Sequence, residues 1–213
     1  MYVARILYLV QVLGPGNRIG IWLCGCPHRC DGCSNPELWE FQDKYSTTID
    51  TVLKLIHSIT AQVSIDGFTI TGGEPFYQYD DLRLLLRQLA EIHPDILVYT
   101  GYTVDALVDK DLSDIAVLID GQYIKSRNTN VPLRGSDNQT VHVLNKEYEQ
   151  LYRDYMSYNP NRIQNFTLKD GVISVGIHKP DFEERLDCLM KEKVKPNDNG
   201  GTCSAPGKSG EKN

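Results

Sequence analysis

The sequence predicts an α/β protein, a partial (β/α)6-type TIM barrel with mainly parallel strands. Strand-like apolar segments alternate with helical ones along much of the chain, which is the pattern of βα units. Residues typical of binding sites recur at the carboxyl ends of the predicted strands, where parallel sheets and barrels place their ligands. The chain has 213 residues. An eightfold barrel usually needs about 250, so we expect only a partial barrel.

The first half of the chain contains two strand–helix units. Residues 19–23 form an apolar run that ends at a cysteine-rich loop, and this run is the first predicted strand. A helix is predicted over 47–61, because Val52, Ile56 and neighbouring apolar residues recur at helical spacing. Residues 68–71 are the second strand, and 80–92 repeat the helical spacing.

The second half continues with shorter elements. The predicted elements are a strand at 96–99, a short helix near Thr103, strands at 115–119 and 138–144, a helix at 146–156, a hairpin of 164–168 with 172–177, and a helix at 181–193. From Lys195 the composition is too polar to bury apolar surface. We therefore expect a barrel domain over 1–178, a C-terminal helix over 179–195 and a disordered tail over 196–213, which holds Cys203.

Composition excludes several classes of function. The formal net charge is −6, and no basic stripe is interleaved with aromatic residues, so we expect no direct nucleic-acid partner. No apolar run reaches the length of a membrane span, so we expect a soluble protein. The cysteines are clustered and no secretory leader precedes them, which indicates reduced thiols and a cytoplasmic location.

Three cysteines carry the strongest chemical signal. Cys26, Cys30 and Cys33 are separated by three and then two residues. A [4Fe–4S] cluster normally takes four thiolates, so a loop with three leaves one iron open to another ligand. Cys24 lies close by, so a closed zinc site with four thiolates is the alternative. The cysteines alone favour the cluster and leave the zinc site open.

A second motif follows the second predicted strand. Gly72, Gly73, Glu74 and Pro75 come directly after the buried run. Two glycines allow close approach of the backbone to a ligand, and the carboxylate is able to accept hydrogen bonds from an ammonium group. The alternative is a plain strand-to-helix turn, with Pro75 in the first helical turn and Glu74 at its positive end. The segment alone does not decide between the two.

Together the two motifs resemble those of the radical S-adenosylmethionine (SAM) superfamily. The resemblance implies the radical SAM fold, with Cys26, Cys30 and Cys33 as ligands of a [4Fe–4S] cluster whose open iron is chelated by SAM. It also implies that residues 72–75 position the methionyl amine of SAM. Gly32 stands where many members have an aromatic residue before the last cysteine.

One branch of the superfamily fits further blocks of the chain. Residues 14–23, 25–28, 32–36, 99–102, 119–121 and 133–139 are similar to blocks of the activating enzymes of anaerobic ribonucleoside-triphosphate reductase. The resemblance implies that the chain installs a glycyl radical on that reductase, with a flavodoxin- or ferredoxin-type electron donor. Two alternatives stay open, a small radical SAM enzyme resembling the carboxy-deazaguanine synthases and a non-enzymatic zinc or Fe–S module.

Four further residues are candidates for contacts with SAM or the partner. Thr100, Tyr102 and Asp120 stand at or just after strand ends. Tyr102 either stacks on the adenine ring or covers the barrel mouth, and Asp120 either bonds the cofactor or caps a turn at Gly121. Arg134 either meets a carboxylate or partner surface or is a solvated loop charge. His28, between two cluster cysteines, is not expected to ligate iron.

Overall fold

The structure is a computed structural model and describes residues 1–158, 162–168, 171–179 and 182. Most of these residues belong to one compact unit, Met1–His178. The predicted C-terminal helix (179–195) and tail (196–213) lie almost wholly outside the described residues, as do Cys188 and Cys203. In the part of the chain that is described, no helix is long and apolar enough to span a membrane.

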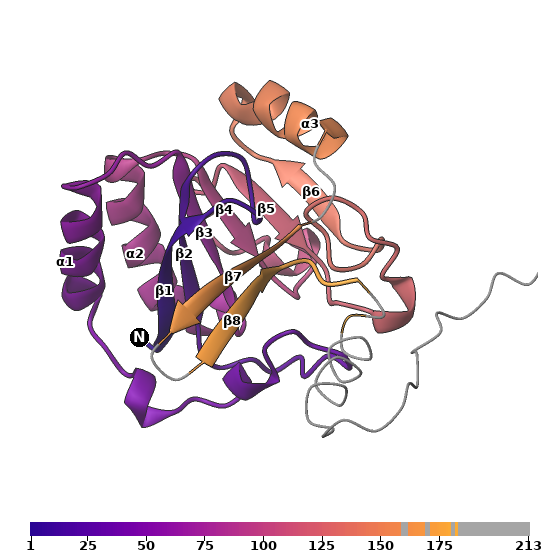
Figure 1. The fold of residues 1–213 in the computed structure, drawn as a ribbon, viewed down its shortest axis with the longest axis horizontal. Coiled ribbons are helices and arrows are strands. Elements are labelled where there is room, and N and C mark those ends of the chain that lie inside the picture. Colours follow the sequence, from indigo (N-terminus) through magenta and orange to yellow (C-terminus); the bar gives the residue numbers. More distant parts are fainter. Residues whose placement is uncertain (159–161, 169–170, 180–181, 183–213) are drawn as a thin grey trace, which may run out of the picture. The chain divides into compact units, whose positions relative to one another are not determined.

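A six-stranded sheet forms the centre of this unit (Figure 1). Its strands lie side by side in the order of the sequence: β1 (Val3–Val10), β2 (Arg18–Leu23), β3 (Gly67–Gly72), β4 (Ile96–Tyr99), β5 (Val117–Asp120) and β6 (Thr140–Val143). β2 to β5 run parallel, whereas β1 and β6 pair antiparallel at the two edges. The carboxyl ends of four parallel strands therefore meet at one edge.

The prediction of an α/β fold with a mainly parallel sheet is confirmed. The described residues do not show a (β/α)6 TIM barrel, and their six-stranded sheet is not closed. β1 was not predicted, and only residues 11–17 connect it to β2. A parallel pair needs a crossover of about a dozen residues or more, so this short link imposes antiparallel pairing. The predicted strand at 138–144 is present as β6, but it turns back antiparallel to β5.

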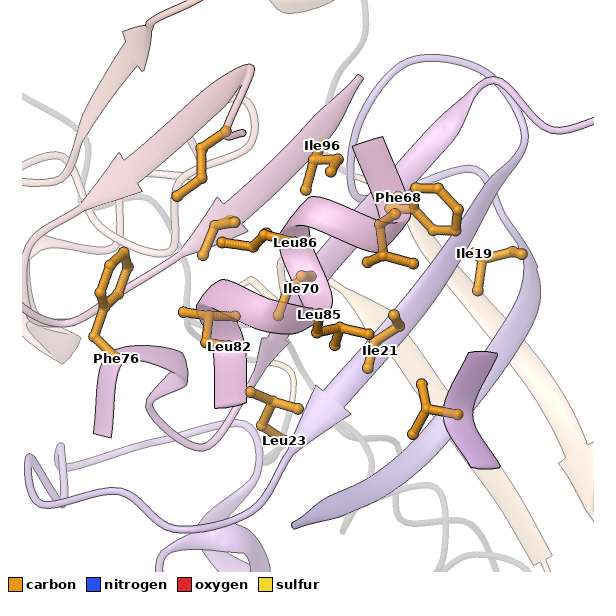
Figure 2. Close-up of a cluster of buried hydrophobic side chains, with 14 of the residues drawn as sticks. Ile19, Ile21, Leu23, Phe68, Ile70, Phe76, Leu82, Leu85, Leu86 and Ile96 are labelled. Atoms are coloured by element: carbon orange, nitrogen blue, oxygen red, sulfur yellow. The ribbon is translucent and has the colours of Figure 1, made fainter. Parts of the chain in front are cut away.

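Two helices cover one face of the sheet (Figure 1). In α1 (Ile49–Thr60), the Thr48 side chain caps the amino end by accepting from the Thr51 N–H. α2 (Tyr79–Ile92) buries leucines spaced three and four residues apart. Figure 2 shows them packed over the alternate side chains that β2 and β3 direct to this face. The residues labelled there are Ile19, Ile21, Leu23, Phe68, Ile70, Phe76, Leu82, Leu85, Leu86 and Ile96.

The opposite face is covered by the last elements of the unit. The predicted hairpin is present as β7 (Ile163–Leu168) paired with β8 (Gly171–Gly176), and Val175 packs with Leu7 and Trp22. The Gln164 amide donates to Leu9 O at 2.6 Å and accepts from Gln11 N at 3.0 Å, where the β1–β2 register shifts. The predicted helix at 146–156 begins later, as α3 (Glu149–Tyr158).

Short 3₁₀ helices fill most of the connections. They are η1 (Pro36–Leu38), η2 (Asp43–Tyr45), η3 (Pro75–Gln78), η4 (Val104–Leu107), η5 (Lys125–Arg127) and η6 (Lys146–Tyr148). η4 is the short helix predicted near Thr103, and it takes the place of a full crossover helix between β4 and β5.

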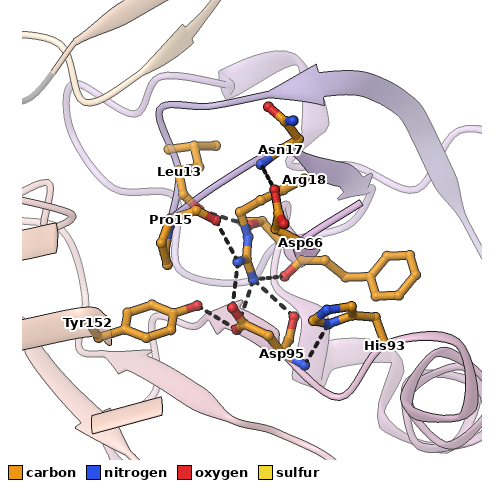
Figure 3. A network of polar contacts seen from close by, with 10 residues as sticks. Leu13, Pro15, Asn17, Arg18, Asp66, His93, Asp95 and Tyr152 are labelled. Carbon is orange, nitrogen blue, oxygen red and sulfur yellow. Dashed lines mark hydrogen bonds and ion pairs between the residues drawn. The ribbon is translucent and has the colours of Figure 1, made fainter. Parts of the chain in front are cut away.

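A buried ion pair ties the amino ends of the strands together (Figure 3). Arg18 and Asp95 are fully buried and pair at 2.9 Å. The Arg18 guanidinium also donates to Thr69 Oγ1 at 2.8 Å and to Pro15 O at 3.1 Å. Burial raises the pKa of the Tyr152 hydroxyl, which donates to Asp95 Oδ1 at 2.7 Å. Residues from β2, β3 and α3 and the residue before β4 thus share one polar centre.

Replacing Asp95 tests this centre. In Asp95→Asn, the buried Arg18 guanidinium loses its counter-charge, so the free energy of unfolding should fall by about 3–5 kcal/mol. Urea denaturation followed by circular dichroism measures it. The control Glu91→Gln, at an exposed position on α2, should change it by less than about 0.5 kcal/mol. Equal stability of both variants would contradict the role given to the pair.

Candidate functional site

The cysteine loop follows β2 and is held by backbone hydrogen bonds. Gly25 N donates to Leu38 O at 2.8 Å and Cys26 N to Trp39 O at 2.7 Å. Cys26, Cys30 and Cys33 are free and partly buried. Cys24 is buried, and its Sγ donates to Glu40 O at 2.8 Å. The fourth nearby thiol is thus engaged with the backbone, and three remain.

Burial and backbone N–H groups set the environment of the thiols in the cysteine loop. Burial raises the pKa values of Cys26 and Cys33, and backbone N–H groups directed at both sulfurs partly offset this effect. One of these is Asn35 N, 3.4 Å from Cys33 Sγ. Among the described residues, no three His, Cys, Asp or Glu side chains are already gathered for a metal ion. A donor set of three cysteines, two of which have backbone N–H groups directed at their sulfurs, nevertheless fits an iron–sulfur cluster.

The glycine motif packs directly against the chain that enters the cysteine loop. Gly73 N donates to Leu23 O at 2.8 Å, and Glu74 N donates to Gly25 O at 2.7 Å. A Cβ on Gly73 would lie 2.4 Å from Gly25 O, and one on Gly72 would lie 2.6 Å from the Leu23 backbone. Both glycines are therefore needed for the ends of β2 and β3 to meet. The following Pro75 is buried as the first residue of η3.

The Glu74 carboxylate contacts segments that follow several strand ends. Its side chain is 1% exposed. Oε1 accepts from Phe76 N at 3.0 Å and from Thr100 Oγ1 at 2.8 Å, and Oε2 accepts from Gly101 N at 2.7 Å. His28 Nε2 lies 3.2 Å from Oε2. The end of β3, the end of β4 and the cysteine loop thus converge on one buried charge.

Tyr102 and Asp120 follow the ends of β4 and β5, respectively. The Tyr102 ring packs edge-on against His28 with centroids 4.6 Å apart, and its pKa is raised by burial and then by the Glu74 charge. Asp120 Oδ2 accepts from Val104 N at 2.7 Å and Oδ1 from Thr140 N at 3.3 Å. Tyr102 therefore faces the cysteine loop, while Asp120 caps neighbouring backbone.

The loop at 133–139 forms its own network at the end of β5. Gln139 accepts from Gly135 N at 2.8 Å and Ser136 N at 3.2 Å, and donates to Gly121 O at 2.7 Å. Arg134 is partly buried, and its Nη1 donates to Gln139 O at 3.2 Å. Arg134 is therefore not a freely solvated charge.

Three residues in or near the cysteine loop were not among the predicted site residues. They are His28, Gln122 and Lys125. His28 contacts Glu74 and Tyr102, and its carbonyl accepts from Gln122 Nε2 at 3.3 Å. A Cβ on Gly32 would lie 2.9 Å from Lys125 Cδ, so the lysine stem lies on the loop. The position of His28 between Cys26 and Cys30 was the one signal that the sequence offered, because Gln122 and Lys125 are distant along the chain.

The fold and the donor set define the class of protein, an α/β protein with an iron–sulfur domain. The family model of a 4Fe-4S single cluster domain matches residues 12–142. The chain is also similar to proteins named anaerobic ribonucleoside-triphosphate reductase-activating protein, and it belongs to their family.

Three of these relatives show how far the similarity extends. Identity is 35% over 135 residues with the protein of Enterobacteria phage T4, covering 61% of this chain and 86% of the relative. It is 33% over 147 residues with that of Escherichia coli K12 (64% and 96%). It is 32% over 145 residues with that of Vibrio cholerae (63% and 94%). More than a third of this chain lies outside each alignment.

Gly73→Ala tests the contact between the two motifs. The added methyl would overlap Gly25 O, a backbone atom that moves only with the cysteine loop. We expect a loss of about 2 kcal/mol or more in the free energy of unfolding, as for overpacking. Denaturation measures it. Lys54→Ala, at an exposed position on α1, is the control and should change the free energy of unfolding by less than about 0.5 kcal/mol. An equal or smaller loss for Gly73→Ala would contradict the contact.

Proposed function

We propose that this chain is a radical SAM enzyme that installs a glycyl radical on anaerobic ribonucleoside-triphosphate reductase. The observation that carries the proposal is the contact of a three-cysteine loop with a Gly-Gly-Glu-Pro segment, through the hydrogen bond from Glu74 N to Gly25 O. Relatives at 31–35% identity bear the name of activating proteins of that reductase, which supports the choice of partner.

The roles of the residues follow from their chemistry. Cys26, Cys30 and Cys33 would hold the cluster, and Gly72, Gly73, Glu74, Pro75, Thr100, Tyr102 and Asp120 are the proposed SAM-binding residues. When bound, the cluster and SAM supply reductive cleavage to methionine and a 5′-deoxyadenosyl radical, which takes a hydrogen atom from Cα of a partner glycine. The chain itself positions the reactants and shields them from water.

The proposal includes the setting of the reaction. A flavodoxin- or ferredoxin-type protein would supply the electron, and the compartment would be the cytoplasm. Four free cysteines in the described part of the chain agree with a reducing environment. The net charge of −6 supports a protein partner over a nucleic acid.

The activity is tested with the full chain under anaerobic conditions. The cluster is reconstituted and reduced with dithionite, SAM is added, and 5′-deoxyadenosine and methionine are measured. With an anaerobic ribonucleoside-triphosphate reductase present, electron paramagnetic resonance should show a glycyl doublet. Cleavage of SAM without a doublet on any reductase would favour the small-molecule alternative. A colourless zinc protein would refute both radical functions.

Cysteine variants test the ligand set. Cys26→Ser, Cys30→Ser and Cys33→Ser should each lose most of the cluster iron and all SAM cleavage, because a neutral hydroxyl replaces a thiolate ligand. Iron and sulfide analysis with visible absorption measures the loss. Cys24→Ser is the matched control, since a serine hydroxyl is able to donate to Glu40 O as the thiol does. Loss of iron in Cys24→Ser alone would point to a different ligand set.

A further inference from the structure

His28 lies in the cysteine loop and contacts the ends of three parallel strands. Its imidazole Nε2 is 3.2 Å from Glu74 Oε2, after β3. Its ring packs against Tyr102, after β4, and its carbonyl accepts from Gln122, after β5. The side chain is 15% exposed. A residue of the loop is thus fixed to three separate parts of the sheet edge.

Neighbouring residues limit the space around the His28 imidazole. A Cβ on Gly101 would lie 2.5 Å from His28 Cδ2, so only glycine leaves room for the ring. Arg29 follows with φ of 48°, in the left-handed region that costs a non-glycine residue of order 1 kcal/mol. The surrounding contacts hold the loop in this conformation against that cost.

The polar end of the ring is committed to Glu74. His28 Nε2 is buried and makes no aligned hydrogen bond, and it lies 3.2 Å from the Glu74 Oε2 atom. Glu74 in turn receives the donors from Thr100 and Gly101. Any movement of the cysteine loop therefore changes the surroundings of the Glu74 carboxylate.

We propose that His28 is a positioning residue that couples the cysteine loop to Glu74, so that the cluster ligands and the SAM-binding segment are held as one unit. The coupling acts through the 3.2 Å approach of the imidazole Nε2 to the Glu74 carboxylate and through the packing of the ring on Gly101 and Tyr102. Iron ligation by His28 forms no part of it. The naming of SAM rests on the proposed function, whereas the mechanical link between loop and carboxylate does not.

Two substitutions separate the parts of the imidazole. His28→Gln keeps an N–H donor and loses the ring, whereas His28→Phe keeps a ring against Tyr102 and loses the donor. Gly101→Ala displaces the imidazole without changing it. His57→Ala, at an exposed histidine on α1, is the control.

The first readout needs no cluster. In the full apoprotein, alkylation of Cys26 and Cys30 by iodoacetamide is followed by mass spectrometry, with buried Cys24 as internal reference. We expect His28→Phe and Gly101→Ala to react several-fold faster than wild type, and His28→Gln and His57→Ala to react as wild type does. Equal rates in all five proteins would overturn the coupling.

The second readout uses the reconstituted enzyme. His28→Phe should keep its iron but show a KM for SAM raised about tenfold, as expected for loss of a close polar contact with a buried carboxylate. His28→Gln, which keeps an N–H donor, should have a KM for SAM close to that of wild type. Loss of iron in His28→Phe, or an unchanged KM, would overturn the inference. If wild type cleaves no SAM, the proposed function and the SAM-binding part of the inference fail, and the alkylation rates still decide the link between loop and Glu74.

Discussion

The site depends on one buried carboxylate. Glu74 is almost completely removed from water, and a buried charge is tolerated only where donors replace its hydration. Those donors come from Phe76, Thr100 and Gly101, while His28 approaches from the cysteine loop. Because the donors lie on different segments, satisfying the charge also fixes the relative positions of those segments. The carboxylate therefore fixes the geometry of the site even when no ligand is bound.

The same strands carry a second buried centre at their other ends. Arg18 and Asp95 join the starts of β2 and β4, with Thr69 and Tyr152 completing the hydrogen bonds. An ion pair in such a place contributes little net stability but is costly to break, so it favours one arrangement of the strands. This division matches the general rule for parallel sheets, in which chemistry lies at the carboxyl ends and stability at the amino ends.

Local patterns in the sequence predicted the parts of the structure that depend on local physics. The continuous apolar run at 19–23 follows from burial on both faces of the sheet, and the leucine spacing in α2 follows from burial on one face of the helix. Both elements are present. The antiparallel direction of β6 depends on its pairing with β5 across the connection 121–139, so no local pattern indicated it. The pairing of β1 was missed because 3–10 was not predicted as a strand, although its short link to β2 fixes the antiparallel direction. Motif spacing likewise singled out Glu74, but neither the donor from Gly101 N nor the approach of His28 to the carboxylate.

The elements beyond the matched family domain complete the support of the site. The family model ends at residue 142, yet Tyr152 of α3 donates to Asp95, and Val175 of β8 packs on Trp22 of β2. Trp22 lies only four residues before Cys26, so packing by β8 reaches the strand that leads into the cysteine loop. Residues beyond the matched domain thus restrain the strand that leads into the cysteine loop. The position of the cysteine loop is a property of the whole Met1–His178 unit, and not of the two motifs alone.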